Sequence, residues 1–236
     1  MKRLDTYSQN FLRSPKLVNK LIGHSTIKKT DTVLDIGAGS GIISAALASR
    51  SAQVIAYEYD SRLVKKLRDN LAYFDNVTVA ETDFLSANLP SGPYKIFANI
   101  PFHLSSPILR KITEADNPPR AVYLIVQKQF AHKLIIDTDR FTGVLGAQVA
   151  PRFTTRVRYV LQRTDFQPAP AVDTVLVELR LRDEPLLPIS QLSDYRAFVD
   201  KCFSRQKFFA TLNVGEKRPS ELTTQEWLQL YQKATR

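Results

Sequence analysis

The chain has 236 residues, enough for one α/β domain with a small appendage and too few for two large domains of equal size. Its net charge of +10 favours nucleic acid over a small acidic metabolite as the partner. The single cysteine, Cys202, excludes an intramolecular disulfide, and no apolar run reaches the length of about 18 residues that a membrane span needs, so we expect a cytoplasmic protein that contacts no membrane.

The first 30 residues form a basic arm, with seven Lys and Arg residues against one Asp. After it, short apolar strands alternate with helical segments. We predict strands over 32–36, 54–58, 77–80, 95–98 and 121–127, and helices over 42–50, 61–71 and 106–112. This alternation predicts right-handed crossovers and a doubly wound parallel α/β sheet, whose ligands bind at the carboxyl ends of the strands.

The pattern changes beyond residue 150. Segments 156–161 and 174–181 read as paired strands, which predicts an antiparallel hairpin at the end of the sheet. From residue 184 the chain reads as helical, and Thr223 with Glu226 forms the capping box of a last helix. We therefore expect a ligand-binding catalytic domain over 1–183, including the basic arm, and a small helical domain that contacts RNA over 184–236.

A glycine-rich turn, DIGAGSG over residues 35–41, follows the first predicted strand. Gly37 and Gly39 permit a tight turn close to a ligand, and the helix that follows offers unpaired N–H groups. Glu58 ends the second strand, where its carboxylate can accept hydrogen bonds from both ribose hydroxyls of a nicotinamide or an S-adenosylmethionine cofactor. Dehydrogenases more usually show Gly-x-Gly-x-x-Gly, so a nicotinamide oxidoreductase is the weaker alternative.

Asp83 follows the third predicted strand. Its carboxylate can accept a hydrogen bond from an adenine amino group while Phe84 lies against the purine ring. The alternative is that Asp83 only caps a helix or a turn.

The turn Asn99-Ile100-Pro101-Phe102 ends the fourth predicted strand. The Asn99 side-chain oxygen and a main-chain carbonyl of the turn can accept both N6 hydrogens of adenine, so that the nitrogen lone pair points at a sulfonium methyl. Phe102 would stack on the base, which must be extruded from its helix or loop. The alternative is an ordinary loop in which Phe102 packs inward.

Six separated segments together resemble the ribosomal RNA adenine N6-methyltransferases: residues 7–12, 35–41, 58, 83, 99–102 and 166–173. The resemblance implies a Rossmann-like methyltransferase sheet with S-adenosyl-L-methionine as cofactor. It implies that the cofactor contacts Gln9, Asn10, Phe11, Leu12, Gly37, Ala38, Gly39, Glu58, Tyr59, Asp83, Phe84 and Asn99. It implies catalytic roles for Asn99, Ile100, Pro101 and Phe102, with Phe166 closing the base pocket opposite Phe102. The family often has Lys where Ala171 stands, so we expect no phosphate contact there.

Two branches of this family share the motifs. The Erm branch methylates an adenine in the peptidyl-transferase loop of 23S rRNA and thereby blocks macrolide, lincosamide and streptogramin B antibiotics. The KsgA-like branch dimethylates two adjacent adenines in 16S rRNA during small-subunit assembly. Asn-Ile-Pro over 99–101, the stretch 130–134 and the short C-terminal segment resemble Erm, so we expect mono- or dimethylation of 23S rRNA and antibiotic resistance. Segments 105–107 and 203–207 resemble the KsgA-like branch, which is the alternative.

Four basic residues of the C-terminal segment are candidates for RNA phosphate contacts or for a solvated surface: Arg205, Lys207, Lys217 and Arg218. A ribosome assembly factor that binds RNA without catalysis is an alternative of another class, although Gly37, Glu58 and Asn99 are intact. The histidines lack ligand spacing, so we expect no metal. We take a monomer that binds ribosomal RNA as the default.

Overall fold

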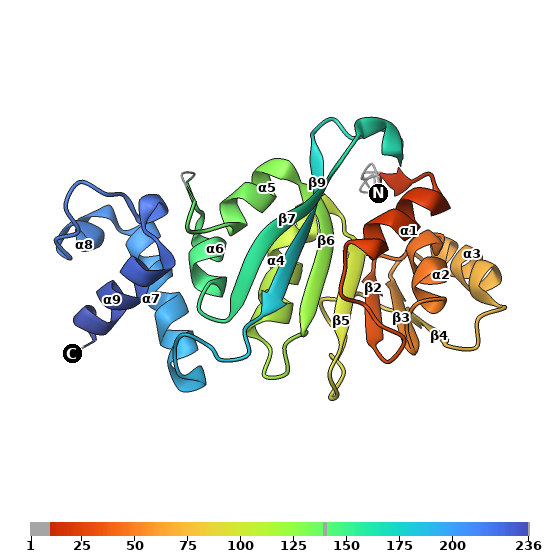
Figure 1. The fold of residues 1–236 in the computed structure, drawn as a ribbon, viewed down its shortest axis with the longest axis horizontal. Coiled ribbons are helices and arrows are strands. Elements are labelled where there is room, and N and C mark those ends of the chain that lie inside the picture. The colour runs from red at the N-terminus through yellow and green to blue at the C-terminus, as the bar shows by residue number, and fades with distance from the viewer. Residues whose placement is uncertain (1–9, 139–140, 236) are drawn as a thin grey trace, which may run out of the picture.

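The computed structural model describes residues 10–138 and 141–235. Within them a seven-stranded sheet runs in the order β4-β3-β2-β5-β6-β9-β7 (Figure 1). Its strands are β2 (Thr32–Ile36), β3 (Gln53–Glu58), β4 (Val77–Glu81), β5 (Lys95–Asn99), β6 (Ala121–Gln127), β7 (Phe153–Leu161) and β9 (Thr174–Leu181). Strands β2 to β6 pair in parallel, and β9 is antiparallel to both β6 and β7. The predicted Rossmann-like α/β sheet with its closing hairpin is confirmed.

Helices cover both faces of the sheet. They are α1 (Pro15–Gly23), α2 (Ile42–Ala48), α3 (Ser61–Leu71), α4 (Ser105–Glu114), α5 (Lys128–Leu134) and α6 (Val144–Val149). Successive side chains of a strand point to opposite faces, so Val33 packs in a core with α1 and α2, and Leu34 packs in a core with α4 and α5. No helix of the described residues is long and apolar enough to cross a membrane.

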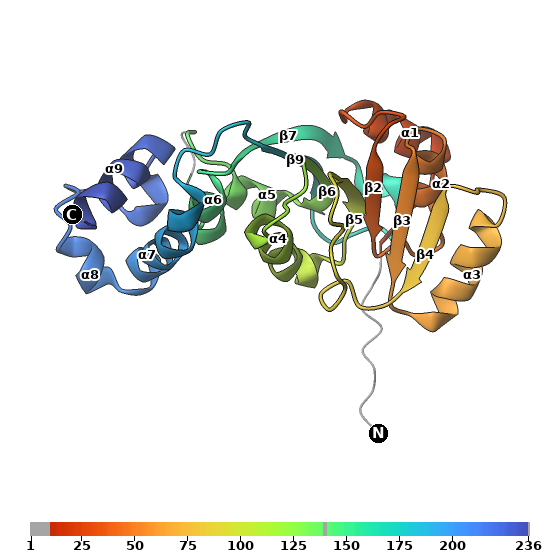
Figure 2. The ribbon, with the colours of Figure 1, turned by 90° about the horizontal axis from the view of Figure 1, so that it is seen from below.

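The chain ends in a helical lobe of α7 (Leu192–Ser204), α8 (Gln206–Ala210) and α9 (Thr224–Ala234). Figure 2 shows this lobe beyond α5 and α6, at the end of the molecule opposite α1 to α3. Its core surrounds Trp227 and Tyr195, which are fully buried, and includes Ala147 of α6. The Tyr195 hydroxyl donates to the Ala147 carbonyl at 3.1 Å, so the lobe is fastened to α6.

Two regions differ from the elements that we predicted. The sequence analysis missed α1, although Ser14 accepts from Leu17 N–H as its N-cap and Pro15 stands in its first turn, a recognisable start signal. It also missed the pairing of β1 (Phe11–Leu12) with β8 (Phe166–Gln167), which forms a separate two-stranded antiparallel sheet. Strands of two residues carry no periodicity, so only the tertiary structure creates them. The predicted capping box of Thr223 and Glu226 is confirmed at the start of α9.

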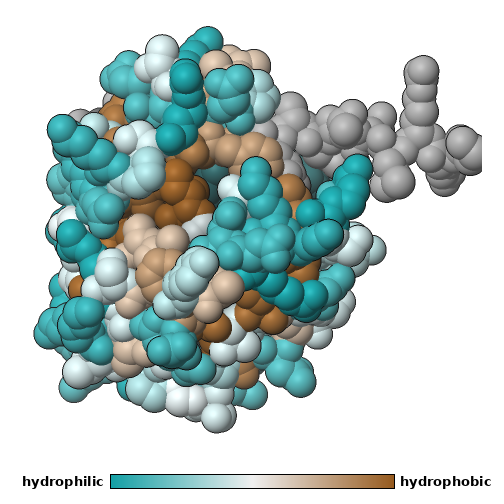
Figure 3. All heavy atoms as spheres, turned by 90° about the vertical axis from the view of Figure 1, so that its right-hand side faces the viewer, coloured by the Kyte–Doolittle hydropathy of each residue, from teal (hydrophilic) through white to brown (hydrophobic). Residues whose placement is uncertain are grey.

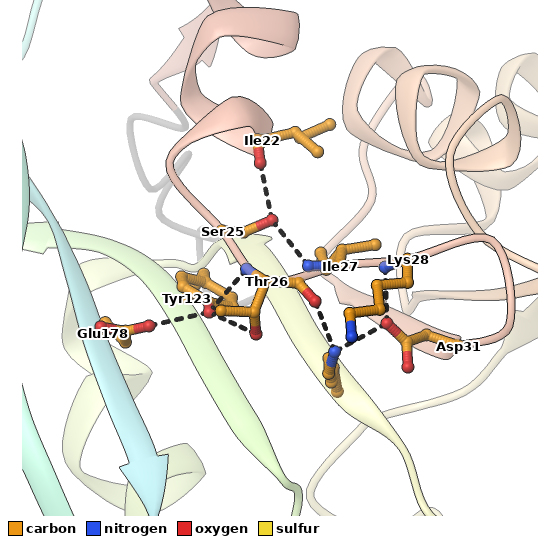
Figure 4. Close-up of polar contacts among 9 residues, drawn as sticks. Ile22, Ser25, Thr26, Ile27, Lys28, Asp31, Tyr123 and Glu178 are labelled. Carbon is orange, nitrogen blue, oxygen red and sulfur yellow. Dashed lines mark hydrogen bonds and ion pairs between the residues drawn. The ribbon is translucent and has the colours of Figure 1, made fainter.

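A polar network holds the connection between α1 and β2 against the sheet (Figure 4). Thr26 N–H donates to the Tyr123 hydroxyl at 2.9 Å, and this hydroxyl donates to the buried Glu178 carboxylate at 2.8 Å. The Lys95 ammonium donates to the Thr26 carbonyl at 2.6 Å and forms an ion pair with Asp31 at 2.7 Å. Because Lys95 begins β5 and Asp31 precedes β2, the network fixes the amino ends of the strands, opposite to the glycine-rich turn.

Candidate active site

The parallel strands bring the predicted site residues to one edge of the sheet. Strands β2 and β3 are paired up to Ile36 and Tyr57, and β3 and β4 up to Glu58 and Glu81. The glycine-rich turn, Glu58, Asp83 and the turn after β5 therefore follow neighbouring strand ends. This is the edge where open α/β sheets bind ligands.

The glycine-rich turn requires glycine at its key positions. Gly37, Gly39 and Gly41 have φ angles of 70°, 59° and 92°, a region that side chains disfavour. A Cβ atom on Gly39 would also lie 2.9 Å from the Phe11 ring, and one on Gly37 would lie 3.5 Å from Pro101. The turn is therefore in close contact with the N-terminal arm and with the turn after β5.

Glu58 binds the backbone around the glycine-rich turn. Its Oε2 accepts from Gly39 N–H at 2.8 Å, and its Oε1 accepts from Tyr59 N–H at 2.9 Å and Asp60 N–H at 3.0 Å. A carboxylate offers about four acceptor positions, and three are used here. About one acceptor position is left for a ribose hydroxyl in this arrangement, and the expected contact with both hydroxyls stays a prediction.

Asp83 and Phe84 are placed differently from each other. Asp83 is exposed, and its Oδ1 accepts from Leu85 N–H at 2.9 Å, so one of its two oxygens has the turn role that the sequence analysis kept open, and the contact of the carboxylate with adenine stays a prediction. The Phe84 ring is only 5% exposed and meets the Tyr57 ring edge-on at 5.2 Å between centroids. The ring is thus part of the core and cannot lie flat on a purine. The open ring beside Glu58 belongs to Tyr59, which is 77% exposed.

The Asn99 side-chain amide uses its nitrogen in a hydrogen bond, whereas its oxygen has no partner among the described residues. Its Nδ2 donates to the Asn10 carbonyl at 2.7 Å. Its Oδ1 is buried, and none of the described residues donates a hydrogen bond to it. Buried polar atoms are paired in the great majority of cases, so this oxygen is available to a donor from a ligand. Pro101 and Phe102 follow it, half-buried, at the start of a short 3-10 helix over Phe102–Leu104.

The N-terminal arm joins both turns. Asn10 contacts Asn99, and Phe11 packs on Gly39 while remaining 37% exposed. Leu12 is buried in the core beneath α1. Gln9, the remaining cofactor residue that we predicted in this arm, lies outside the described residues. The structure therefore brings Asn10 and Phe11 to the edge where the two turns meet.

Phe166 does not have the open position that we predicted. It is 2% exposed, pairs with Leu12 between β8 and β1, and packs in the same core as Leu21 of α1. A ring enclosed in this way cannot stack on an incoming base. The expected base-pocket role of Phe166 is wrong for this structure, because the residue is an anchor for the N-terminal arm.

Comparison with known proteins decides the family. Residues 2–220 match the family model for ribosomal RNA adenine dimethylase. The chain belongs to this family. The small-subunit ribosomal RNA methyltransferases A of Streptococcus equi subsp. zooepidemicus and Streptococcus agalactiae serotype Ia are each 34% identical to it over 194 residues, with 78% of this chain and 67% of the relative covered.

Solved structures agree with this assignment. The crystal structure of the 23S rRNA methyltransferase ErmE has a TM-score of 0.81 and 28% identity, and the alignment covers 96% of this chain and 100% of that one. A dimethyladenosine transferase from Plasmodium falciparum has a TM-score of 0.80 and 24% identity, with 95% and 97% covered, and shows the shared fold. This dimethylase-family chain is therefore an S-adenosylmethionine-dependent ribosomal RNA adenine methyltransferase.

The residues of this family member fit the cofactor. The left-handed glycines open the turn to a ligand, Glu58 keeps one acceptor position, and the unpaired Asn99 oxygen faces no protein donor among the described residues. Within the same residues, no group of three or more His, Cys, Asp and Glu side chains is placed to hold a metal ion.

The sequence analysis missed Asp35 as a site residue of this dimethylase-family chain. It is 1% exposed below the glycine-rich turn, and its Oδ2 accepts from the Ser44 hydroxyl at 2.6 Å. Its Oδ1 has no hydrogen-bond partner among the described residues. Burial, with a smaller contribution from the nearby Glu58 carboxylate, raises the pKa of Asp35 to about 7, although the Ser44 hydrogen bond acts in the opposite direction. In the sequence, Asp35 reads only as the last polar residue of a strand.

We expect Phe11→Ala to weaken cofactor binding about five- to tenfold in this dimethylase-family enzyme, because an aromatic contact of this kind is worth roughly 1 kcal/mol. The substitution removes the ring that packs on Gly39 and loosens the arm that holds Asn99. Isothermal titration with S-adenosylhomocysteine measures the change. Tyr73→Ala is the control, since Tyr73 is 93% exposed and lies after α3. Equal affinities for Phe11→Ala and wild type would contradict the expectation.

Proposed function

We propose that this chain transfers methyl groups to N6 of adenine in 16S rRNA, in the cytoplasm, with Asn99 as the residue that holds the amine. The observation that carries the proposal is the buried Asn99 Oδ1, which is fixed in direction because Nδ2 is bound to the Asn10 carbonyl. An amide group held in this way presents its oxygen to an exocyclic amine. It cannot present its N–H group there instead.

Methyl transfer to the adenine amine requires only two hydrogen-bond acceptors from the protein in this mechanism. When bound, S-adenosylmethionine supplies an activated methyl group on a sulfonium. Asn99 Oδ1 accepts one N6 hydrogen, and we assign the second to the Ile100 carbonyl, because Leu104 N–H already donates to the Pro101 carbonyl at 2.9 Å. Both contacts draw the nitrogen lone pair out of the ring system. As the N–C bond forms and the S–C bond breaks, the nitrogen becomes cationic, and its proton then leaves to water.

Phe102 is the aromatic residue that we propose for stacking on the base. It is half-buried at the start of the 3-10 helix that follows Pro101. Base stacking on an aromatic ring contributes roughly 1–3 kcal/mol. Tyr59, which is exposed beside Glu58, stays a candidate for contact with the cofactor, whereas the Phe84 ring is buried.

The names of the relatives favour small-subunit RNA as the target, whereas the sequence analysis favoured 23S rRNA. The relatives at 34% identity are small-subunit methyltransferases. One observation favours 23S rRNA, with antibiotic resistance, as the second candidate: the 23S rRNA methyltransferase ErmE has a TM-score of 0.81 and 28% identity. Small-subunit RNA is the proposed target, because the relatives named for it have the higher sequence identity, 34% against 28% for ErmE.

Of the four basic residues that we proposed for RNA contacts, two form ion pairs within the protein and two are exposed at the start of α8. Lys217 forms an ion pair with Glu226, and Arg218 forms one with Glu221 and stacks on Phe141 at 4.6 Å from the ring centroid. Arg205 and Lys207 are exposed at the start of α8, so they remain candidates for phosphate contacts. Figure 3 shows the α1 to α3 end of the molecule, where hydrophilic side chains surround a hollow that contains hydrophobic ones. Phosphate contacts position the RNA and do not select its sequence.

Labelled methyl transfer tests the proposal. Purified enzyme is incubated with labelled S-adenosylmethionine and, separately, with undermethylated small subunits and with 23S rRNA, and the modified adenines are mapped. We expect label near the end of 16S rRNA. Label only in the peptidyl-transferase loop would replace this target by the second candidate, and RNA binding without any label would favour a non-catalytic assembly factor.

A further inference from the structure

The segment between β4 and β5 is held by side chains from outside it. It covers residues 82–94, contains Asp83 and Phe84, and has no helix or strand of its own. Ser86 N–H and Ala87 N–H both donate to the Asp83 carbonyl, at 3.0 and 3.1 Å, which folds its first half into a turn. We call residues 83–87 the adenine loop, after the proposed position of the cofactor's adenine.

Lys111 of α4 binds the adenine loop directly. Its ammonium donates to the Leu85 carbonyl at 2.9 Å and also to the Ala87 carbonyl. The same nitrogen lies 5.2 Å from the centroid of the Phe84 ring. An ammonium has three donors and no acceptor, so two carbonyls and the face of one ring satisfy it.

The environment of Lys111 differs from that of a surface lysine. Burial lowers its pKa, and the Asp83 carboxylate partly opposes this effect. The loop residues Leu85 and Ala87 also pack against the apolar core formed with Ile108 and Ile112 of α4. The Lys111 ammonium therefore interacts mainly with main-chain carbonyls of the adenine loop.

We propose that Lys111 is a positioning residue for cofactor binding, which holds the adenine loop against α4 so that Asp83 faces the adenine ring. This inference rests on the proposed function and on the predicted contact of the Asp83 carboxylate with the cofactor's adenine. Helix α4 begins at Ser105, directly after the turn that contains Asn99 and Phe102. Lys111 thus also fixes the adenine loop relative to the turn that binds the methyl acceptor.

The other half of the segment provides a matched control. Asn117 Nδ2 donates to the carbonyls of Pro90, Ser91 and Gly92 at 2.8, 3.1 and 2.9 Å. It holds the same connection through the same kind of contact, but its three acceptors lie seven or more positions after Asp83. Replacement of Asn117 therefore measures how cofactor affinity and stability change when residues 82–94 are loosened in general. Replacement of Lys111 measures the additional effect of releasing the adenine loop.

Four variants of the full chain test the inference: Lys111→Met, Lys111→Arg, Asn117→Ala and Asp83→Ala. We expect Lys111→Met to weaken S-adenosylhomocysteine binding and to raise KM for S-adenosylmethionine about tenfold, as for loss of a charged hydrogen bond, with kcat within about twofold of wild type. Lys111→Arg keeps donors within reach of the carbonyls and should recover most of the affinity. Asn117→Ala should lower Tm without changing the Kd. If Lys111→Met does not fold, Lys111→Gln replaces it, with an expected Kd between those of Lys111→Arg and Asp83→Ala.

The outcomes separate the inference from the proposed function. Wild-type affinity in Lys111→Met, or in its substitute Lys111→Gln, with weak binding in Asp83→Ala would overturn the role of Lys111 and leave the cofactor position in place. Wild-type affinity in Asp83→Ala would overturn the cofactor position, and the inference with it. An equal loss of affinity in Asn117→Ala and Lys111→Met would show a purely structural effect and would also overturn the inference.

Discussion

Asn99→Ala is expected to lower kcat for methyl transfer about 100- to 1000-fold, the usual effect of removing a group that stabilises the transition state. The variant loses the oxygen that accepts an N6 hydrogen, so the adenine amine keeps its lone pair in the ring. Steady-state rates with labelled S-adenosylmethionine and the RNA substrate measure the loss. Cofactor binding should be retained in large part, because the glycine-rich turn and Glu58 remain in place.

Asn70→Ala is the control for this experiment. Asn70 Nδ2 donates to the Ser40 carbonyl at 2.8 Å, so it is a second asparagine bound to the backbone near the cofactor turn. It is exposed on α3, and its hydrogen bond goes to the glycine-rich turn and not to the turn after β5. Its loss should leave kcat within about twofold of wild type, as for most exposed substitutions. A turnover number unchanged in Asn99→Ala would remove Asn99 from the mechanism.

Asp35→Asn is expected to stabilise the folded protein at pH 8 by roughly 1–3 kcal/mol and to have little effect on stability at pH 4. Burial raises the pKa of Asp35 to about 7, above its ordinary value of 3.8. Between these two values the folded state holds a proton that the unfolded state has released. Stability of the wild type therefore falls as pH rises from about 4 to 7 and stays lowered above 7. The neutral amide of the variant avoids this cost.

Thermal unfolding at pH 4 and pH 8 measures the effect, and the variant should gain in Tm mainly at pH 8. The new amide hydrogens will lack partners beside Ser44, so the gain should be smaller than the pKa shift alone implies. Asp69→Asn, at an exposed position of α3, is the control and should be neutral at both pH values. A gain for Asp35→Asn that is equal at the two pH values would show that no buried charge is involved.

The sequence by itself determined the sheet and its ligand edge. Strand 121–127 and helix 61–71 were predicted with the bounds that the structure shows, because the first is a continuous apolar run and the second repeats apolar residues at helical spacing. Once parallel strands are assigned, Glu58, Asp83 and Asn99 must follow neighbouring strand ends. The sequence therefore suffices for the ligand edge of the sheet, for the methyltransferase family and for the cofactor.

Only the tertiary structure decided what individual side chains do there. The free oxygen of Asn99 depends on a carbonyl 89 positions away, the enclosure of Phe166 depends on its pairing with Leu12, and Lys111 meets a loop that precedes it by more than 20 residues. A periodic pattern gives the face on which a side chain lies, but not the atom that it meets across the core. Partners so distant along the chain are set by packing, and for Asp35 the same packing also sets the pKa.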